Sequence, residues 1–408
     1  MIIKHNSKLA LLGVSLTVII FLGILPSQIL AYKYQKDEYW PDWDKWRIAE
    51  PETQGMNSSH IDKMYDFILA NEINLHSVTI VRNGYIIHEE YLKNGTYVPS
   101  GKKSYEWPDH IPDWDLHDGR SHHVWSVTKS VVSLLTGIAI EMGLFDLDTA
   151  FFDVFPDRWD LVKYNDSLAP PWDGKKLITV EHLLKQNVGI FPWDDSDPGW
   201  WGPDFPPNPS LSIDYYLSQP MAYLPGTPSP FAWTYSSANG DLLSVMIANR
   251  SGMTMADFAR KYLFKPLKIR DSEWFWWLTP SAWGTGDLGF KNEGGLGLFL
   301  TPRAMARIGL MCLNNGKWRG RQVVPEDWIG ESTGVQITPF GIYNYGYKWW
   351  VTPGKYYQAF GLNNQRIIVI PDYNIVVVFT ANELDDYTWS GPINSWLVDD
   401  FIIPAVIP

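Results

Sequence analysis

The sequence lacks several features that would each indicate a different kind of protein. It has one cysteine, Cys312, so an internal disulfide cannot form. It has no run of lysine or arginine residues, and its formal net charge of -12 argues against nucleic acid as a partner. No linker poor in apolar residues divides the chain into independent domains. With 408 residues and 45% hydrophobic content, the chain can bury a large core.

One long apolar run is present, close to the N-terminus. It covers residues 9–25 without a charged side chain, and two lysines precede it. This pattern predicts that residues 1–31 export the chain, either as a cleaved signal peptide or as an N-terminal membrane anchor, and both readings stay open. Residues 32–408 then form one folded domain outside the cytoplasm.

Strand-like sequence lies towards both ends of the chain. The stretch "HSVTIVRNGYIIHEEYLKNG" holds two β-rich runs around Asn83-Gly84, a strong hairpin signal. Further runs, "YYQAFGLN", "QRIIVIPD" and "NIVVVFTAN", follow near the C-terminus. Residues 126–343 are mostly helical and loop-like, and terminal helices are expected, the first capped by Asn57 or Ser58. The predicted class is α+β, with an antiparallel sheet from both chain ends, terminal helices packed on it and a helical region inserted between its halves.

The stretch "VWSVTKSVVSLLTGIAI" places Ser126 and Lys129 at the start of an apolar helix. Residues three apart share a helix face, so the amine can contact the hydroxyl. The helix N-terminus also favours a developing oxyanion. A second Ser-x-x-Lys, at Ser100, lies between Pro99 and Gly101, where no helix is expected. Ser126 is therefore the candidate nucleophile, the alternative being a simple helix cap with a lysine that extends to water.

A proton acceptor for that serine must also be found. A lysine at its ordinary pKa is protonated at neutral pH, so Lys129 needs either a lowered pKa or a second group that takes the proton. Tyr235, at a loop-to-helix junction in "AWTYSSANGDLL", can be that group. A tyrosinate held by a lysine cation could accept the serine proton and return it to the leaving group.

These motifs together resemble the serine β-lactamase and penicillin-binding-protein superfamily, above all its class C-like esterases and the 6-aminohexanoate-dimer hydrolase type. The similarity runs from about Trp46 to the C-terminus and includes "ITVEHLLKQNVGI", "GGLGLFLTPRAMARIGLMCLNNGKW" and "YGYKWW". The resemblance implies the β-lactamase/transpeptidase-like fold and a Ser126 acyl-enzyme, with Lys129 and Tyr235 as the proton-transfer pair. It also implies an oxyanion hole formed by the backbone NH groups of Ser126 and Leu362.

Two departures from the family pattern affect the expected substrate. The second family motif is usually Tyr-x-Asn, but Ser237 stands in the position of the amide, as a candidate substrate contact. The third, Lys-Thr-Gly, corresponds to Ala359-Phe360-Gly361, in which Gly361 suits a close approach of backbone to substrate. Ala359 replaces the lysine that would bind a carboxylate. We therefore expect a neutral ester or amide as substrate.

Two other functions stay open at this point. A penicillin-recognising β-lactamase or DD-peptidase would need another cation, and Arg366 is the candidate. A non-catalytic binding protein on the same fold would explain the loss of two motif residues. Trp193 and Trp277 are candidates for walls of a substrate pocket.

No cofactor or metal ion is expected. The segment "DHIPDWDLHDGRSHH" is rich in histidine and aspartate, but its spacing matches no known metal site, and the adjacent His122 and His123 cannot readily bind one ion. The expected partners are a small-molecule substrate and, if residues 1–31 are not cleaved, a membrane. An oligomeric state does not follow from the sequence.

Overall fold

A computed structural model describes residues 40–41, 45–71, 73–92, 116–117, 121–159, 172–190, 213–281, 283–284, 289–341, 343–381 and 396–407. The export segment, Trp193 and most of the His- and Asp-rich segment lie outside these ranges, so the predictions made for them stay predictions. The described residues belong to one compact unit that begins at Trp40. Within these ranges, every helix is too short or too polar to span a lipid bilayer.

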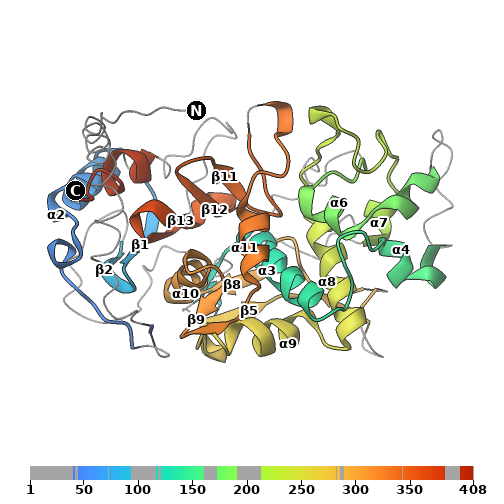
Figure 1. Ribbon diagram of the computed structural model, residues 1–408, viewed down its shortest axis with the longest axis horizontal. Coiled ribbons are helices and arrows are strands. Elements are labelled where there is room, and N and C mark those ends of the chain that lie inside the picture. The colour runs from blue at the N-terminus through green and yellow to red at the C-terminus, as the bar shows by residue number, and fades with distance from the viewer. Residues whose placement is uncertain are drawn as a thin grey trace, which may run out of the picture. The chain divides into compact units, whose positions relative to one another are not determined.

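The largest sheet is built from both ends of the chain, which confirms the predicted fold class. It has six strands in the order β11-β12-β13-β14-β1-β2, and every neighbouring pair is antiparallel. Figure 1 labels β1 and β2 from the N-terminal part of the chain and β11, β12 and β13 from the C-terminal part. Asn83 and Gly84 join β1 to β2 with φ values of 52° and 82°, as a type I′ turn requires. The strands are β1 (Leu75–Arg82), β2 (Tyr85–Tyr91), β11 (Trp350–Thr352), β12 (Tyr356–Gly361), β13 (Gln365–Ile370) and β14 (Ile375–Ala381).

Helices cover both faces of this sheet. Successive side chains of a strand point to opposite faces. Ile368 and Ile370 of β13 pack with residues of α2 and of the C-terminal π-helix η15. Ile367 and Val369 pack on the other face with residues of α3 and α10. The main helices are α2 (Ser58–Ala70), α3 (Val127–Glu141), α4 (Phe151–Val154), α6 (Val180–Lys185), α7 (Ile213–Ser218), α8 (Ala238–Ser251), α9 (Met255–Ala259), α10 (Pro302–Leu313), α11 (Glu326–Thr333) and η15 (Leu397–Ile402).

Short strands in the inserted region were not predicted from the sequence. Four of them form a second sheet in the order β3-β4-β8-β5, and β6-β7 and β9-β10 are hairpins. Strands of two or three residues are too short for an alternating pattern to be recognised. They are β3 (Leu116–His117), β4 (Ser121–His123), β5 (Trp274–Trp276), β6 (Leu278–Pro280), β7 (Phe290–Asn292), β8 (Leu298–Leu300), β9 (Lys317–Trp318) and β10 (Arg321–Gln322).

His88 on β2 makes the stability of the fold depend on pH. Its Nε2 lies 2.6 Å from the Tyr65 hydroxyl, and burial lowers its pKa from the ordinary 6.5 to about 4. Below pH 6.5, His88 is protonated in the unfolded chain but stays neutral in the folded chain. The free energy of unfolding therefore decreases as the pH falls towards the folded pKa. We expect wild type to lose about 2 kcal/mol more than His88→Gln between pH 6.5 and 5 in urea unfolding. All other titratable groups are shared and cancel, so equal losses would contradict this expectation.

Candidate active site

Ser126 lies in a tight turn between β4 and α3. Trp125 has a φ of 48°, a rare backbone conformation for so large a side chain. The amide of Val127 donates across the turn to the carbonyl of Val124, at 3.1 Å. Ser126 occupies the N-cap position of α3, but its side chain makes no capping hydrogen bond. This observation argues against the reading of Ser126 as a simple helix cap.

Lys129 directs its amine at Ser126 from one turn further along α3. Its Nζ donates to Ser126 Oγ at 2.9 Å, to Ser237 Oγ at 3.0 Å and to the carbonyl oxygen of Gly295 at 2.9 Å. The residue is 1% exposed, so it does not extend to water. Because a carbonyl oxygen can only accept, Gly295 holds an N–H of Lys129 in either protonation state. A neutral Lys129 can then present its lone pair to the Ser126 hydroxyl.

Tyr235 lies against the same amine. Lys129 Nζ is 4.7 Å from the centroid of the Tyr235 ring, within cation–π distance. Tyr235 comes from the segment that precedes α8, and α8 packs on α3. The structure thus brings together Ser126, Lys129, Tyr235 and Ser237 from two segments more than 100 residues apart in the sequence.

The end of β12 closes the site beside Ser126. A Cβ added to Gly361 would lie 2.2 Å from the carbonyl oxygen of Val124 and 3.2 Å from the backbone nitrogen of Ser126. A residue without a side chain is therefore required at this contact. Leu362 is next in the chain, so the two amides expected to form the oxyanion hole come from segments in contact.

The close approach of Gly361 leads to a testable expectation. Gly361→Ala should push the end of β12 away from Ser126 and lower kcat for ester hydrolysis by roughly 10²-fold, because small displacements of catalytic groups are costly. Gly330→Ala is the matched control, since a Cβ there has no atom within 4 Å. Steady-state kinetics of both variants, with thermal unfolding as a check on folding, measure the effect. A Gly361→Ala protein with wild-type kcat would contradict the assigned contact.

A small apolar cluster lies beside this turn. Trp277 and Leu362 pack on Trp125 and Leu296, so Trp277 lies near Ser126, and its role as a pocket wall stays a prediction. Trp276, its neighbour, is 3% exposed and belongs to the main core. The alternation of side chains along an extended segment explains why adjacent tryptophans have different surroundings.

The sequence did not predict a buried ion network that reaches Lys129 through the backbone of Gly295. Lys291 Nζ donates to Asp241 Oδ2 at 2.9 Å and to Glu293 Oε2 at 2.6 Å. Asp241 Oδ1 accepts from the amides of Gly294 at 2.6 Å and Gly295 at 3.1 Å. The carbonyl of Gly295 in turn accepts from Lys129. The network therefore fixes the backbone that holds the Lys129 amine.

The three charged groups of this network change one another's pKa. Burial, together with the Glu293 carboxylate, raises the pKa of Asp241 to about 7 despite Lys291. Burial acts to lower the pKa of Lys291, but Asp241 and Glu293 outweigh it and raise that pKa. Burial acts to raise the pKa of Glu293, but Lys291 outweighs it and lowers that pKa. One cation between two buried carboxylates explains why one carboxylate is difficult to ionise.

Arg366 lies on the other face of the sheet from Ser126. It is paired with Phe360, whereas Ile367 is paired with Ala359 on the face towards α3. Its guanidinium is fully buried, donates to Gln358 and Asn364 and stacks 3.8 Å from the centroid of the Phe360 ring. This position gives no support to Arg366 as the cation for a substrate carboxylate.

The adjacent His122 and His123 have separate partners. His122 Nε2 lies 2.9 Å from His76 Nδ1, and His123 Nε2 lies 2.7 Å from the carbonyl oxygen of Leu296. Burial lowers the pKa of His122 to about 4 and that of His123 to about 3. Both are therefore neutral at neutral pH, and each ring is held by a partner of its own.

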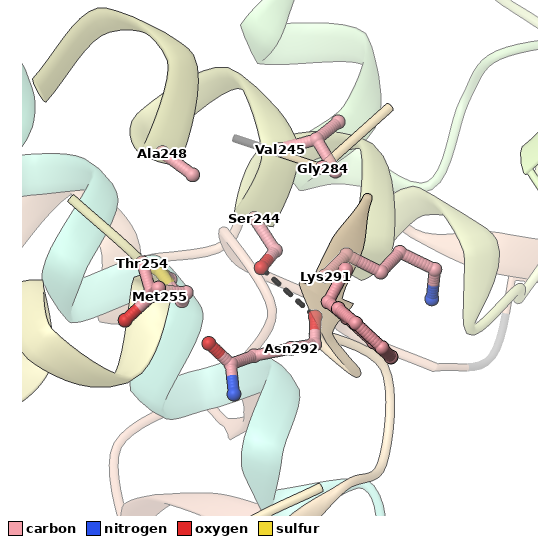
Figure 2. A pocket seen from close by; sticks show the side chains of 9 residues that line it. Ser244, Val245, Ala248, Thr254, Met255, Gly284, Lys291 and Asn292 are labelled. Atoms are coloured by element: carbon pink, nitrogen blue, oxygen red, sulfur yellow. Dashed lines mark hydrogen bonds between the residues drawn. The ribbon is translucent and has the colours of Figure 1, made fainter. Parts of the chain in front are cut away.

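A small cavity near α8 is separate from the catalytic residues. Figure 2 shows that residues of α8 and β7 line it, and that Ser244 Oγ donates to the carbonyl of Asn292 across it, at 3.0 Å. It has room for about one water molecule. It is too small to be a substrate site.

The sheet with helices on both faces and the buried Lys129 beside Ser126 define the class of protein: a β-lactamase/transpeptidase-like fold with the residues of a serine hydrolase. A family model described as beta-lactamase matches residues 113–388, and the chain belongs to this family. A relative, 6-aminohexanoate-dimer hydrolase of Paenarthrobacter ureafaciens, is 24% identical over 293 residues, which are 68% of this chain and 71% of that protein.

Solved structures show the same fold. A D-stereospecific amidohydrolase from Streptomyces sp. matches 85% of this chain and 99% of its own, with a TM-score of 0.57 and 15% identity. The octameric penicillin-binding protein homologue from Pyrococcus abyssi matches 84% of this chain and 77% of its own, with a TM-score of 0.58 and 18% identity. The comparisons thus place the chain in a superfamily of hydrolases.

Proposed function

We propose that this protein is an exported serine hydrolase that cleaves uncharged esters or amides through an acyl-enzyme on Ser126. The observation that carries the proposal is the position of Lys129, whose buried amine lies 2.9 Å from Ser126 Oγ. The Tyr235 ring lies beside that amine. Residues 1–31 supply the export signal in this proposal.

The reaction would proceed by two acyl transfers. Ser126 Oγ attacks the substrate carbonyl carbon while its proton passes to the Lys129 and Tyr235 pair. The amides of Ser126 and Leu362 stabilise the oxyanion. The bond to the leaving group breaks, and the same pair returns the proton to the leaving oxygen or nitrogen. Water then attacks the acyl-enzyme by the reverse sequence, which releases the acid and restores the serine.

The side chains at the third motif support an uncharged substrate. Ala359 is fully buried on the face towards α3, so no cation is present at that position. Arg366 is on the opposite face of the sheet, so its guanidinium cannot replace a lysine at position 359. A β-lactam or peptide carboxylate would therefore lack the charge-assisted contact that favours its binding.

Labelling with a fluorophosphonate probe tests the proposal. Wild type should be labelled and should hydrolyse short p-nitrophenyl esters, and Ser126→Ala should do neither. Equal labelling of the two proteins would refute the proposal and favour a binding protein on the same fold. Stable labelling by a fluorescent penicillin at Ser126 would favour the penicillin-recognising alternative.

A further inference from the structure

Two turns far apart in the sequence bring aromatic side chains together outside the catalytic residues. One turn is the 3-10 helix Pro230–Ala232, which carries Phe231, and the other is Pro339–Gly341, which carries Phe340. The centroids of these two rings are 6.4 Å apart, and Trp233 lies 6.1 Å from Phe340. We call Phe231, Trp233, Tyr235, Phe340 and Trp350 the aromatic strip.

The aromatic strip is continuous with the catalytic residues. The Trp233 and Trp350 rings lie 5.8 Å and 5.9 Å from the Tyr235 ring, and 6.2 Å from each other. Lys129 Nζ lies 4.7 Å from the same Tyr235 ring. A row of neighbouring rings therefore leads from the amine beside Ser126 outwards.

The inner rings of the row are buried and the outer rings are exposed. Tyr235 is 7% exposed and Trp233 2%, whereas Phe340 is 39% and Phe231 68% exposed. Exposed phenylalanines contribute little to a core, and Phe340 also has a φ of 53°. A bulky residue in this left-handed region is strained, and such residues are concentrated at ligand-binding sites. The strained backbone of Phe340 thus costs stability while its ring remains partly exposed at the surface.

The direction of the strip identifies which part of a substrate it would meet. In the proposed mechanism Tyr235 helps to return the proton to the leaving atom, so that atom must lie near the inner end of the strip. The group attached to it then extends over Trp350, Phe340 and Phe231. Aromatic rings prefer offset or edge-to-face contact with other aromatic rings.

We infer that the aromatic strip is a subsite for the leaving group of the substrate and that it selects an uncharged aromatic alcohol or amine. This inference rests on the proposed function and specifies its substrate class. Benzyl acetate and cyclohexylmethyl acetate are suitable probes, because both release a primary alcohol and differ in the aromaticity of the ring. Ethyl phenylacetate and ethyl cyclohexylacetate place the same rings on the acyl side.

Measured as kcat/KM, wild type should prefer benzyl acetate by about fivefold, the amount that aromatic contacts contribute beyond buried area. Phe340→Leu and Phe231→Leu should each reduce that preference, and the ratio for the two acyl-side probes should stay unchanged. Tyr373→Leu is the control, because Tyr373 is 38% exposed in the turn between β13 and β14, a comparable exposure to that of Phe340.

The outcomes separate this inference from the proposed function. Ser126-dependent turnover without a preference for benzyl acetate, or with a preference that both variants retain, would overturn the subsite and leave the hydrolase intact. If the variants instead changed the ratio for the two acyl-side probes, the strip would contact the acyl group of the substrate, and the leaving-group subsite would be wrong. The absence of Ser126-dependent turnover of any probe would overturn the proposed function and the subsite with it. Thermal unfolding of each variant verifies its fold, and the two single variants provide independent tests.

Discussion

Replacement of Lys129 by methionine is expected to lower kcat for ester hydrolysis by roughly 10³-fold, the usual contribution of a positioned acid or base. KM should change little, because Lys129 is 1% exposed and its amine donates to Ser126, Ser237 and Gly295 within the protein. Methionine keeps an unbranched side chain of similar length and removes the amine. Loss of kcat with an unchanged KM is the signature of an interaction made in the transition state.

A surface variant provides the control for this experiment. Lys317→Met removes an amine that is 47% exposed and bonded to Glu326. It should retain wild-type kcat and KM. If Lys129→Met kept activity within a few-fold of wild type, the proton would have to leave Ser126 by another route, and the proposed role of Lys129 would be wrong.

Removal of Asp241 is expected to affect both stability and catalysis. Asp241→Ala leaves Lys291 with one buried carboxylate and leaves the amides of Gly294 and Gly295 without their acceptor. Breaking a buried charge pair in this way typically costs about 3 to 5 kcal/mol. The Gly295 carbonyl would then lose its fixed position against Lys129, and kcat should fall by roughly 10²-fold.

A conservative variant distinguishes positioning from general destabilisation. Asp241→Asn keeps a side-chain oxygen that can accept from Gly294 and Gly295, but it loses the charge that faces Lys291. It should therefore recover most of kcat while it remains less stable than wild type. Urea unfolding and steady-state kinetics on both variants measure the two effects. If Asp241→Asn regained stability and kcat to the same extent, or if Asp241→Ala kept wild-type kcat, Asp241 would not position Lys129.

The local parts of the fold and site could be predicted because their signals are local. Asn57 caps α2 by accepting from the Ser59 amide, and Asn83-Gly84 forms the hairpin turn. The contact between Ser126 and Lys129 follows from the helical repeat alone. Tyr235 was a candidate from its place at a loop-to-helix junction and the resemblance gave it the same role, but no spacing rule connects it with residues more than 100 positions earlier.

The missed parts depend on contacts between distant segments. Asp241 and Lys291 are 50 residues apart, and a single carboxylate near the start of α8 gives no indication of its partner. Gly295 acts through its backbone carbonyl, which has no sequence signature. The charged pair in "KNEGG", immediately before two glycines, was the only local indication of a fixed loop. The aromatic strip likewise depends on two turns that meet only in the folded chain.

The central pairing of the large sheet has a consequence for how the chain acquires its structure. Ser77 of β1 bonds to Thr380 of β14 at 2.6 Å, and the two residues are 303 positions apart. Strand pairs with such large sequence separation form late and slowly, since a long loop must close first. A nascent or truncated chain without residues 375–381 would expose the edges of β1 and β13, which are then free to pair with other chains. Truncation just before β14 should therefore yield aggregated protein rather than a smaller folded one.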